Sequence, residues 1–326
     1  VLNRAYQSYR QPGSCIKPLN VYTPYLQLGN TPDTKVTDSQ IDGGPANADA
    51  SYAGEMTLTD AVKWSKNTVA WNIYQQITPK TGSSFLIKMG FHKIWVDKDY
   101  NAGALGGFTY GVTTEEMAGG YAALANDGVY RKATCIRLIV NASNKTVVNE
   151  TNRDSKVYDK SASRMMTQML REVVLSGTGT SANVENAVVA GKTGTTNASK
   201  DVWFCGYSKY YTTTVWAGYD YPKEMSGVNS RVNAIFKDFM TAVHTNLPVT
   251  DFSTVTQQTT QPETTAAVQE ETESLPQETT AIVPETTGIE QVTPQQVPST
   301  TAQVPTTTPY QRWTTAPAQP LSLIHI

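Results

Sequence analysis

Residues 10–18 read Arg-Gln-Pro-Gly-Ser-Cys-Ile-Lys-Pro and hold the one Ser-x-x-Lys of the chain, formed by Ser14 and Lys17. A Pro-Gly turn followed by the start of a helix would place both side chains on one face, a turn apart. A serine hydroxyl needs a base to become a nucleophile, and a desolvated neutral lysine can serve as that base. Near pH 7 this requires burial and a neighbouring positive charge to lower the lysine pKa by ~3 units from ~10.4. The plainer interpretation is a helix cap beside a surface lysine, because short motifs often match by chance.

The composition limits what the whole chain can be. It has 326 residues, 39% of them hydrophobic, with 26 Lys and Arg against 28 Asp and Glu, which suits one large domain or two small ones. No Lys/Arg run marks a nucleic-acid surface, and no apolar stretch reaches the ~18 residues of a membrane span. Cys15, Cys135 and Cys205 form no Cys-x-x-Cys, and the three histidines are scattered. We therefore expect no metal site and no cofactor.

Two changes of composition divide the chain. Residues 1–249 carry 25 basic and 20 acidic residues, whereas residues 250–326 carry one basic and eight acidic residues. Residues 250–320 are dominated by Thr, Pro, Gln and Glu and cannot bury enough apolar surface to fold, so we predict a disordered tail. Residues 321–326 return abruptly to apolar character and resemble the translation of a sequencing-adaptor end. We set them aside from the fold as a suspected artefact.

Hydrophobic periodicity predicts helices first and a group of strands late in the chain. Apolar residues at helical spacing predict helices over residues 58–77, 115–126, 161–175 and 232–243. Strands are expected at residues 187–190, 203–207 and 212–219, the last two joined as a hairpin. Hairpin-linked strands followed by an amphipathic helix favour an α/β protein of the α+β kind, with an antiparallel sheet flanked by helices.

Two further short motifs carry polar side chains. Ser65-Lys66-Asn67 falls on the helix predicted over 58–77, or in a turn at its middle, and offers a hydroxyl relay and an amide for a substrate carbonyl. The pattern recurs at residues 181–183, so the signal is weak. Lys-Thr-Gly also occurs twice: residues 80–82 have loop composition, whereas residues 192–194 continue a strand. A strand edge of that composition can pair with an extended peptide, so we take residues 192–194 as the functional copy.

These motifs together resemble those of the penicillin-binding proteins. Residues 10–18, residues 65–67 and residues 190–196, which read Ala-Gly-Lys-Thr-Gly-Thr-Thr, match the three motifs of that family in the family's order. Four further stretches resemble the class A, bifunctional members of the penicillin-binding protein 1A type, namely residues 105–107, 110–113, 116–118 and 176–180. The resemblance covers roughly residues 1–247 and implies a serine D,D-transpeptidase/β-lactamase-like fold in residues 1–249. It also implies that the first strands of the sheet, a membrane anchor and a glycosyltransferase domain precede Val1, so that the chain is truncated at its N-terminus.

The resemblance implies a serine-type D-Ala-D-Ala transpeptidase/carboxypeptidase that crosslinks peptidoglycan and is acylated by β-lactams. Ser14 would attack the penultimate D-Ala carbonyl of a stem peptide, Lys17 would be the general base, and Ser65 would pass the proton to the leaving group. The backbone N–H groups of Ser14 and Thr195 would form the oxyanion hole. The remaining substrate contacts would come from Asn67 at the peptide amide, Lys192 through its charge, Gly194 by close backbone approach, and Thr193 and Thr195 at the terminal carboxylate.

Two other functions stay open. One is a D,D-carboxypeptidase or β-lactamase of the same fold, in which water replaces the acceptor amine, although no segment resembles the loop glutamate with which β-lactamases activate water. The other is a non-catalytic penicillin-binding wall module whose Thr/Pro-rich tail is the functional part, against which the Ser14–Lys17 pair argues. The family implies stem peptides and β-lactams as ligands, cell-wall synthesis and division proteins as candidate partners, and no nucleic acid. It places the chain at the extracytoplasmic face of the bacterial membrane, reached through the expected anchor.

Overall fold

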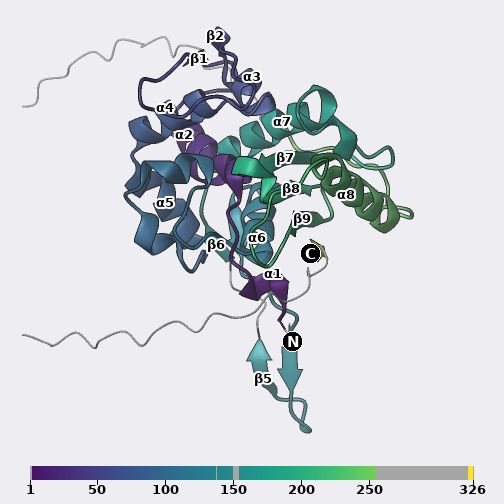
Figure 1. Ribbon diagram of the computed structural model, residues 1–326. Helices are drawn as coiled ribbons and strands as arrows, with labels where there is room; N and C mark the ends of the chain where they lie inside the picture. The colour runs from purple at the N-terminus through teal and green to yellow at the C-terminus, as the bar shows by residue number, and fades with distance from the viewer. Residues whose placement is uncertain (1, 137, 150–153, 255–321, 326) are drawn as a thin grey trace, which may run out of the picture. The chain divides into compact units, whose positions relative to one another are not determined.

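The computed structural model describes residues 2–136, 138–149, 154–254 and 322–325 (Figure 1). The α-helices of these residues are α1 (Arg4–Gln7), α2 (Thr23–Leu26), α3 (Leu58–Lys63), α4 (Asn67–Ile77), α5 (Pro79–Lys88), α6 (Thr114–Ala125), α7 (Lys160–Ser176) and α8 (Asn229–Val243). Shorter helical turns are η1 (Gly13–Ile16), η2 (Pro18–Tyr22), η3 (Ile94–Asp97), η4 (Asn101–Leu105), η5 (Thr180–Ala182) and η6 (Asn197–Ser199). The strands are β1 (Lys35–Asp38), β2 (Gly54–Thr57), β3 (Val129–Arg131), β4 (Leu138–Val140), β5 (Thr146–Asn149), β6 (Asp154–Lys156), β7 (Ala190–Thr195), β8 (Asp201–Tyr207), β9 (Thr212–Gly218) and β10 (Ser322–His325).

The largest sheet of the described residues has four antiparallel strands in the order β10-β9-β8-β7. In its register Lys192 of β7 lies opposite Cys205 of β8, and Trp203 of β8 lies opposite Trp216 of β9. Strand β8 is buried along its whole length, so helices cover both faces of the sheet, as expected. Residues 322–325, part of the suspected artefact, pair with β9 as β10.

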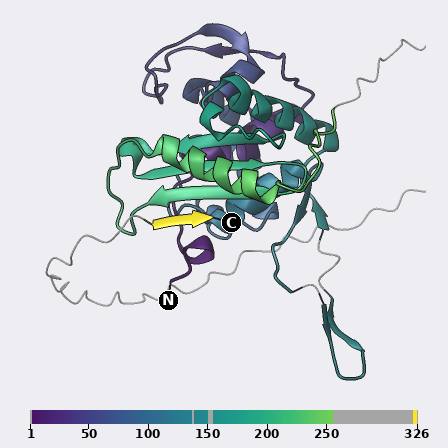
Figure 2. The same ribbon diagram turned by 90° about the vertical axis from the view of Figure 1, so that its right-hand side faces the viewer.

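Side chains of β8 and β9 alternate between two cores, one on each face of the sheet. Phe204 and Val215 pack with α8, where the rings of Phe204 and Phe236 lie 4.5 Å apart; Figure 2 shows α8 lying across this face. Trp203 and Trp216 belong to the other core, which is built with α6, α7 and η1. The period-2 alternation of a strand thus divides the apolar residues between two helical layers.

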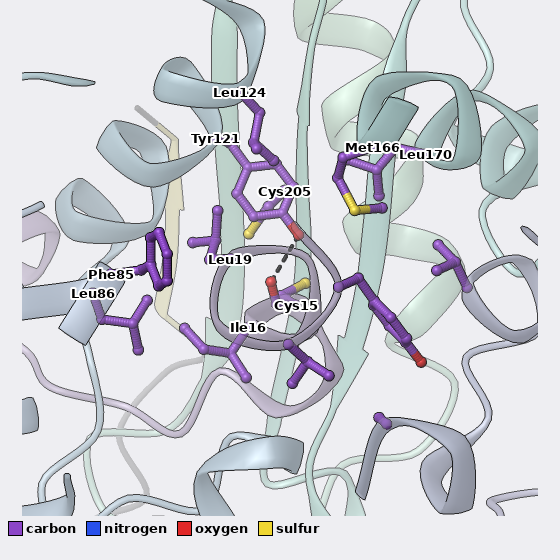
Figure 3. Close-up of a cluster of buried hydrophobic side chains, with 14 of the residues drawn as sticks. Cys15, Ile16, Leu19, Phe85, Leu86, Tyr121, Leu124, Met166, Leu170 and Cys205 are labelled. Atoms are coloured by element: carbon purple, nitrogen blue, oxygen red, sulfur yellow. Dashed lines mark hydrogen bonds between the residues drawn. The ribbon is translucent and has the colours of Figure 1, made fainter. Parts of the chain in front are cut away.

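The segment that carries Ser14 runs through the second core. Figure 3 shows Cys15 and Ile16 of η1 among side chains of α5, α6, α7 and β8. The Tyr121 hydroxyl of α6 donates a hydrogen bond of 2.7 Å to the Cys15 carbonyl oxygen. The Cys15 thiol donates to the Lys192 carbonyl oxygen of β7 at 3.1 Å. The backbone beside Ser14 is therefore held between a helix and the sheet.

Most predicted elements are present, and three predictions are wrong. The helices at 115–126, 161–175 and 232–243 correspond to α6, α7 and α8, and the β8–β9 hairpin is confirmed. The single helix predicted over 58–77 is instead α3 and α4, and the turn between them confirms the second of the two placements considered for residues 65–67. The strand predicted at 187–190 begins only at residue 190 and contains the whole Lys-Thr-Gly motif. Residues 80–82, predicted as loop, lie in α5, because Pro79 suits the first helical turn and Thr78 caps it. Of the predicted tail, residues 255–320 lie outside the described residues.

Candidate active site

Ser14 lies in η1, one residue after a glycine with a left-handed backbone. Gly13 has φ +52°, and a Cβ there would lie 2.9 Å from the Thr195 carbonyl oxygen. Only glycine allows this approach of η1 to β7. The Ser14 carbonyl accepts a bond from the Lys17 N–H, and Pro18, which has no N–H, then opens the wider π-helical turn η2. Ser14, the candidate nucleophile, therefore lies just before the change from η1 to the wider turn η2, against the backbone of β7.

Lys17 is fully buried, and its amine points at the second motif. Its Nζ donates to Asn67 Oδ1 at 2.7 Å and to the Ser65 carbonyl at 2.9 Å, and the Lys66 carbonyl oxygen lies farther away at 3.4 Å. Burial, and then the charge of Lys192, hold the pKa of Lys17 well below its ordinary value. These are the two causes that a lysine needs in order to act as a base near neutral pH.

Ser65 lies in the turn that separates α3 from α4. Its N–H bonds to the Val62 carbonyl, and the N–H of Lys66 bonds to the Ala61 carbonyl, which is the pattern of a Schellman cap. That cap needs one residue in the left-handed region, most often glycine, and here it is Ser65 with φ +58°. A serine held in this sparsely populated conformation marks the turn as a candidate functional site.

Strand β7 supplies the third group of candidate residues. Lys192 is fully buried, and burial lowers its pKa to about 8; its Nζ donates to the Thr193 carbonyl at 3.2 Å. The hydroxyls of Thr193 and Thr178 lie 2.7 Å apart. Thr195 donates from its hydroxyl to Oδ1 of Asn229, the first residue of α8, at 3.3 Å. Two threonine hydroxyls therefore follow the buried lysine along one strand.

Gly194 lies where β7 touches η1. A Cβ at this position would lie 2.5 Å from the Pro12 carbonyl oxygen and 2.8 Å from Cys15 Sγ. No side chain fits there without moving the strand or the segment before Ser14. In the structure Gly194 approaches the segment that carries Ser14, whereas its expected approach to a substrate peptide stays a prediction.

The three predicted motifs converge around Lys17, although not every predicted contact is formed. Lys17 bonds to residues 65–67 and, among the described residues, not to the Ser14 hydroxyl. Catalytic hydrogen bonds are often long or misaligned before substrate binds and tighten in the complex. The arrangement places a desolvated amine, two serines and a lysine-bearing strand in one region.

Two residues of this region were not predicted from the sequence. Thr178, which meets Thr193, lies in the stretch 176–180, which was noted only for its resemblance. Asn47 accepts a bond of 2.7 Å from the Asn67 N–H, yet no short motif marks it. Pro45 and the small residues around Asn47 could have signalled a turn, but not which helix it meets.

Comparison with known proteins identifies the family. The model of the penicillin binding protein transpeptidase domain matches residues 1–241. The chain belongs to the class A penicillin-binding protein transpeptidases. It is 36% identical over 233 residues to penicillin-binding protein 4 of Bacillus subtilis, covering 70% of this chain and 37% of that protein. It is 35% identical over 245 residues to penicillin-binding protein 1F of the same organism, covering 71% and 34%.

The fold of the family is seen in solved structures. PonA1 of Mycobacterium tuberculosis, solved in complex with penicillin V, superposes with a TM-score of 0.67 at 22% identity, over 78% of this chain and 74% of that one. The chain spans about a third of the length of the two Bacillus relatives. Among the described residues no helix is long and apolar enough to cross a bilayer. In the same residues, His, Cys, Asp and Glu do not gather in threes at metal-binding distance.

Proposed function

We propose that the chain is a serine D,D-transpeptidase that crosslinks peptidoglycan through an acyl-enzyme on Ser14, and that β-lactams acylate the same residue. The observation that carries this proposal is the environment of Lys17. Its amine is buried, its pKa is lowered by burial and by Lys192, and it bonds to Asn67 and to the Ser65 backbone. A neutral amine that lies one helical turn from Ser14 in the chain and bonds to the Ser65 backbone can serve as the base for serine acylation.

The proposed acylation starts with proton transfer from the Ser14 hydroxyl to Lys17. Ser14 Oγ then forms a bond to the penultimate D-Ala carbonyl, and the backbone N–H groups of Ser14 and Thr195 stabilise the oxyanion, each worth about 3 kcal/mol. The approach of Gly13 to Thr195 supports this pairing of amides. Ser65 carries the proton to the nitrogen of the departing D-Ala, which breaks the peptide bond. An amine of a second stem peptide then attacks the ester and releases Ser14.

Substrate binding is assigned to β7 and Asn67. Lys192 supplies a buried cation, the hydroxyls of Thr193 and Thr195 lie beside it on the same strand, and Gly194 keeps the strand against the nucleophile segment. A stem peptide that ends in a carboxylate fits this cation and these hydroxyls. Asn67 offers its amide to the peptide chain.

The wider roles of the whole protein follow from the family. We propose that it also carries a glycosyltransferase domain, that it acts at the extracytoplasmic face of the cell membrane, and that it meets cell-wall synthesis and division proteins there. The two Bacillus relatives are about three times longer than the aligned region, which leaves length for such a domain.

The test is covalent labelling with a fluorescent penicillin. The native chain and Cys15→Ala should take the label, whereas Ser14→Ala should not, with thermal melting used to show that all three are folded. The Cys15 thiol is buried and donates to the backbone of β7. Cys15→Ala is therefore the control that tests whether this neighbouring thiol, and not Ser14, takes the label. A folded native chain without label contradicts the proposed acylation.

A second measurement separates transfer from hydrolysis. A D-Ala-D-Ala peptide is supplied with and without an acceptor amine, and the products are identified. Transpeptidation gives the amide product with the acceptor present. Release of free acid alone in both cases would indicate the carboxypeptidase instead.

A further inference from the structure

The Ser65–Asn67 turn is contacted by residues 46 and 47, which lie outside the three motifs. Asn47 lies in the chain between β1 and β2 and is only 5% exposed. Its Oδ1 accepts from the N–H groups of Asn67 and Thr68, at 2.7 and 3.3 Å. These N–H groups open α4, and the N-cap residue Lys66 provides no side-chain cap of its own. Asn47 therefore caps α4 from twenty residues away, satisfying N–H groups that a helix leaves free.

Asp38 of β1 contacts both Asn47 and residues of the Ser65–Asn67 turn and the start of α4. It is fully buried, and its carboxylate accepts from Asn47 Nδ2 at 2.6 Å and from the Thr68 hydroxyl. It also forms an ion pair with Lys66 at 3.3 Å. The Asn47 amide donates a second bond, to the Ser51 carbonyl at 2.8 Å. Both the oxygen and the nitrogen of the Asn47 amide are thus directed by the surrounding segment.

These contacts affect Lys17 because its hydrogen-bond acceptors among the described residues all lie in residues 65–67. Two are the backbone carbonyls of Ser65 and Lys66, and the third is Asn67 Oδ1. The same segment also fixes the other end of the Asn67 side chain, whose Nδ2 donates to the Ala46 carbonyl at 2.9 Å. Since Ser65 occupies a strained conformation, the turn needs outside contacts to stay in place.

We propose that Asp38 and Asn47 form a positioning pair that sets Lys17 and Asn67 for acylation of Ser14. In the described part of the chain neither residue forms a hydrogen bond or ion pair with Ser14 or Lys17, and the pair acts through the Ser65–Asn67 turn. This proposal rests on the proposed transpeptidase function.

The first test is Asn47→Ala in the full chain, measured by the rate of covalent labelling over a range of fluorescent-penicillin concentrations. We expect the maximal acylation rate to fall by about 10- to 100-fold, since displacing catalytic groups by ~1 Å costs about that much. The concentration for half-maximal rate should change less than the maximal rate does, because the ligand contacts assigned to β7 are untouched and only the contact assigned to Asn67 is disturbed. A loss of fold alone would lower the labelled fraction without slowing the folded molecules.

Asn141→Ala is the matched control. Asn141 also accepts two backbone N–H groups with its Oδ1, those of Ser143 and Lys145, but it does so in the exposed β4–β5 hairpin. Its removal should leave both labelling parameters unchanged.

The second test exchanges donor and acceptor between the two residues. Asn47→Asp retains an oxygen for α4 but places a second carboxylate against Asp38, and should slow acylation. Adding Asp38→Asn restores one carboxylate and one amide to the pair and should recover much of the rate. If Asn47→Ala does not melt cooperatively, these two variants decide the question.

Each result has a defined meaning. Folded Asn47→Ala or Asn47→Asp with the native acylation rate overturns the positioning role alone, and so does a double variant no faster than Asn47→Asp. A native chain that takes no label overturns the proposed function and the positioning role with it.

Discussion

Ser65 occupies a conformation that glycine would adopt at lower cost, so replacing it separates stability from catalysis. Its φ of +58° closes the Schellman cap of α3, and a side chain in that region costs about 1–2 kcal/mol. Glycine removes this strain but has more backbone freedom to lose on folding. We therefore expect Ser65→Gly to raise the free energy of unfolding by about 1 kcal/mol relative to an alanine variant. For a domain of this size that is a melting temperature higher by about 2–4 °C.

Ser65→Ala is the matched variant, because it also lacks the hydroxyl but keeps the strained backbone. Both variants should acylate with penicillin at least about 10²-fold more slowly than the native chain, the usual contribution of a group that carries a proton. Melting curves and labelling rates of the three chains give the comparison. If Ser65→Gly melts no higher than Ser65→Ala, the strain argument is refuted. If either variant labels at the native rate, Ser65 carries no proton in acylation.

Three further substitutions test other contacts of the site. Lys192→Gln removes a charge that helps to lower the pKa of Lys17, and the pKa of Lys17 should therefore rise. Because the base must be neutral to accept a proton, the acid limb of the acylation pH profile should move to higher pH. Gly194→Ala forces β7 away from the segment before the nucleophile, and labelling should slow by about 10²-fold for a displacement near 1 Å. Asp201→Ala leaves the buried guanidinium of Arg10 without its partner at 2.7 Å, and should cost about 3–5 kcal/mol of stability, seen as a melting temperature lower by roughly 6–20 °C.

Each of these has a control or a contrary result. Gly43 has φ +67°, and a Cβ at this position would meet open space, so Gly43→Ala should not slow labelling. Arg131 and Asp154 form a similar but exposed pair, and Asp154→Ala should leave the melting temperature unchanged. An acid limb that stays in place in Lys192→Gln would show that Lys192 does not act on Lys17.

The sequence was sufficient wherever one local pattern decided the structure. The apolar spacing along residues 232–243 specified α8, because one helical face meets Phe204 and its neighbours on the sheet. The β8–β9 hairpin followed from two apolar runs a few residues apart. The three motifs were informative together because they are far apart in the chain but must meet at one site, and they do meet around Lys17.

The predictions failed where a contact with a distant segment overrides the local pattern. The break at Ser65 is invisible to periodicity, because apolar residues continue on both sides of it and serine does not signal a left-handed turn. Residues 80–82 look like a loop by composition, yet Thr78 and Pro79 start a helix there. Asn47 was missed because its partners lie across the fold, at the opening of α4.

The surroundings of the two lysines in the candidate site lower their pKa values, by burial for both and by a neighbouring charge in addition for Lys17. Lys17 and Lys192 are both fully buried, and neither forms an ion pair with a residue that the structure describes. Burial lowers the pKa of Lys192 to about 8, so it still holds its proton at neutral pH, and that charge lowers the pKa of Lys17 further than burial alone. Protonating both would place two unpaired cations in a medium of low dielectric. We therefore expect Lys192 to stay a cation suited to a carboxylate and Lys17 to be the lysine that can act as a base. A substrate carboxylate at Lys192 would supply the missing counter-ion and raise the pKa of Lys192, so anionic substrate would keep the proton on the binding lysine during acylation.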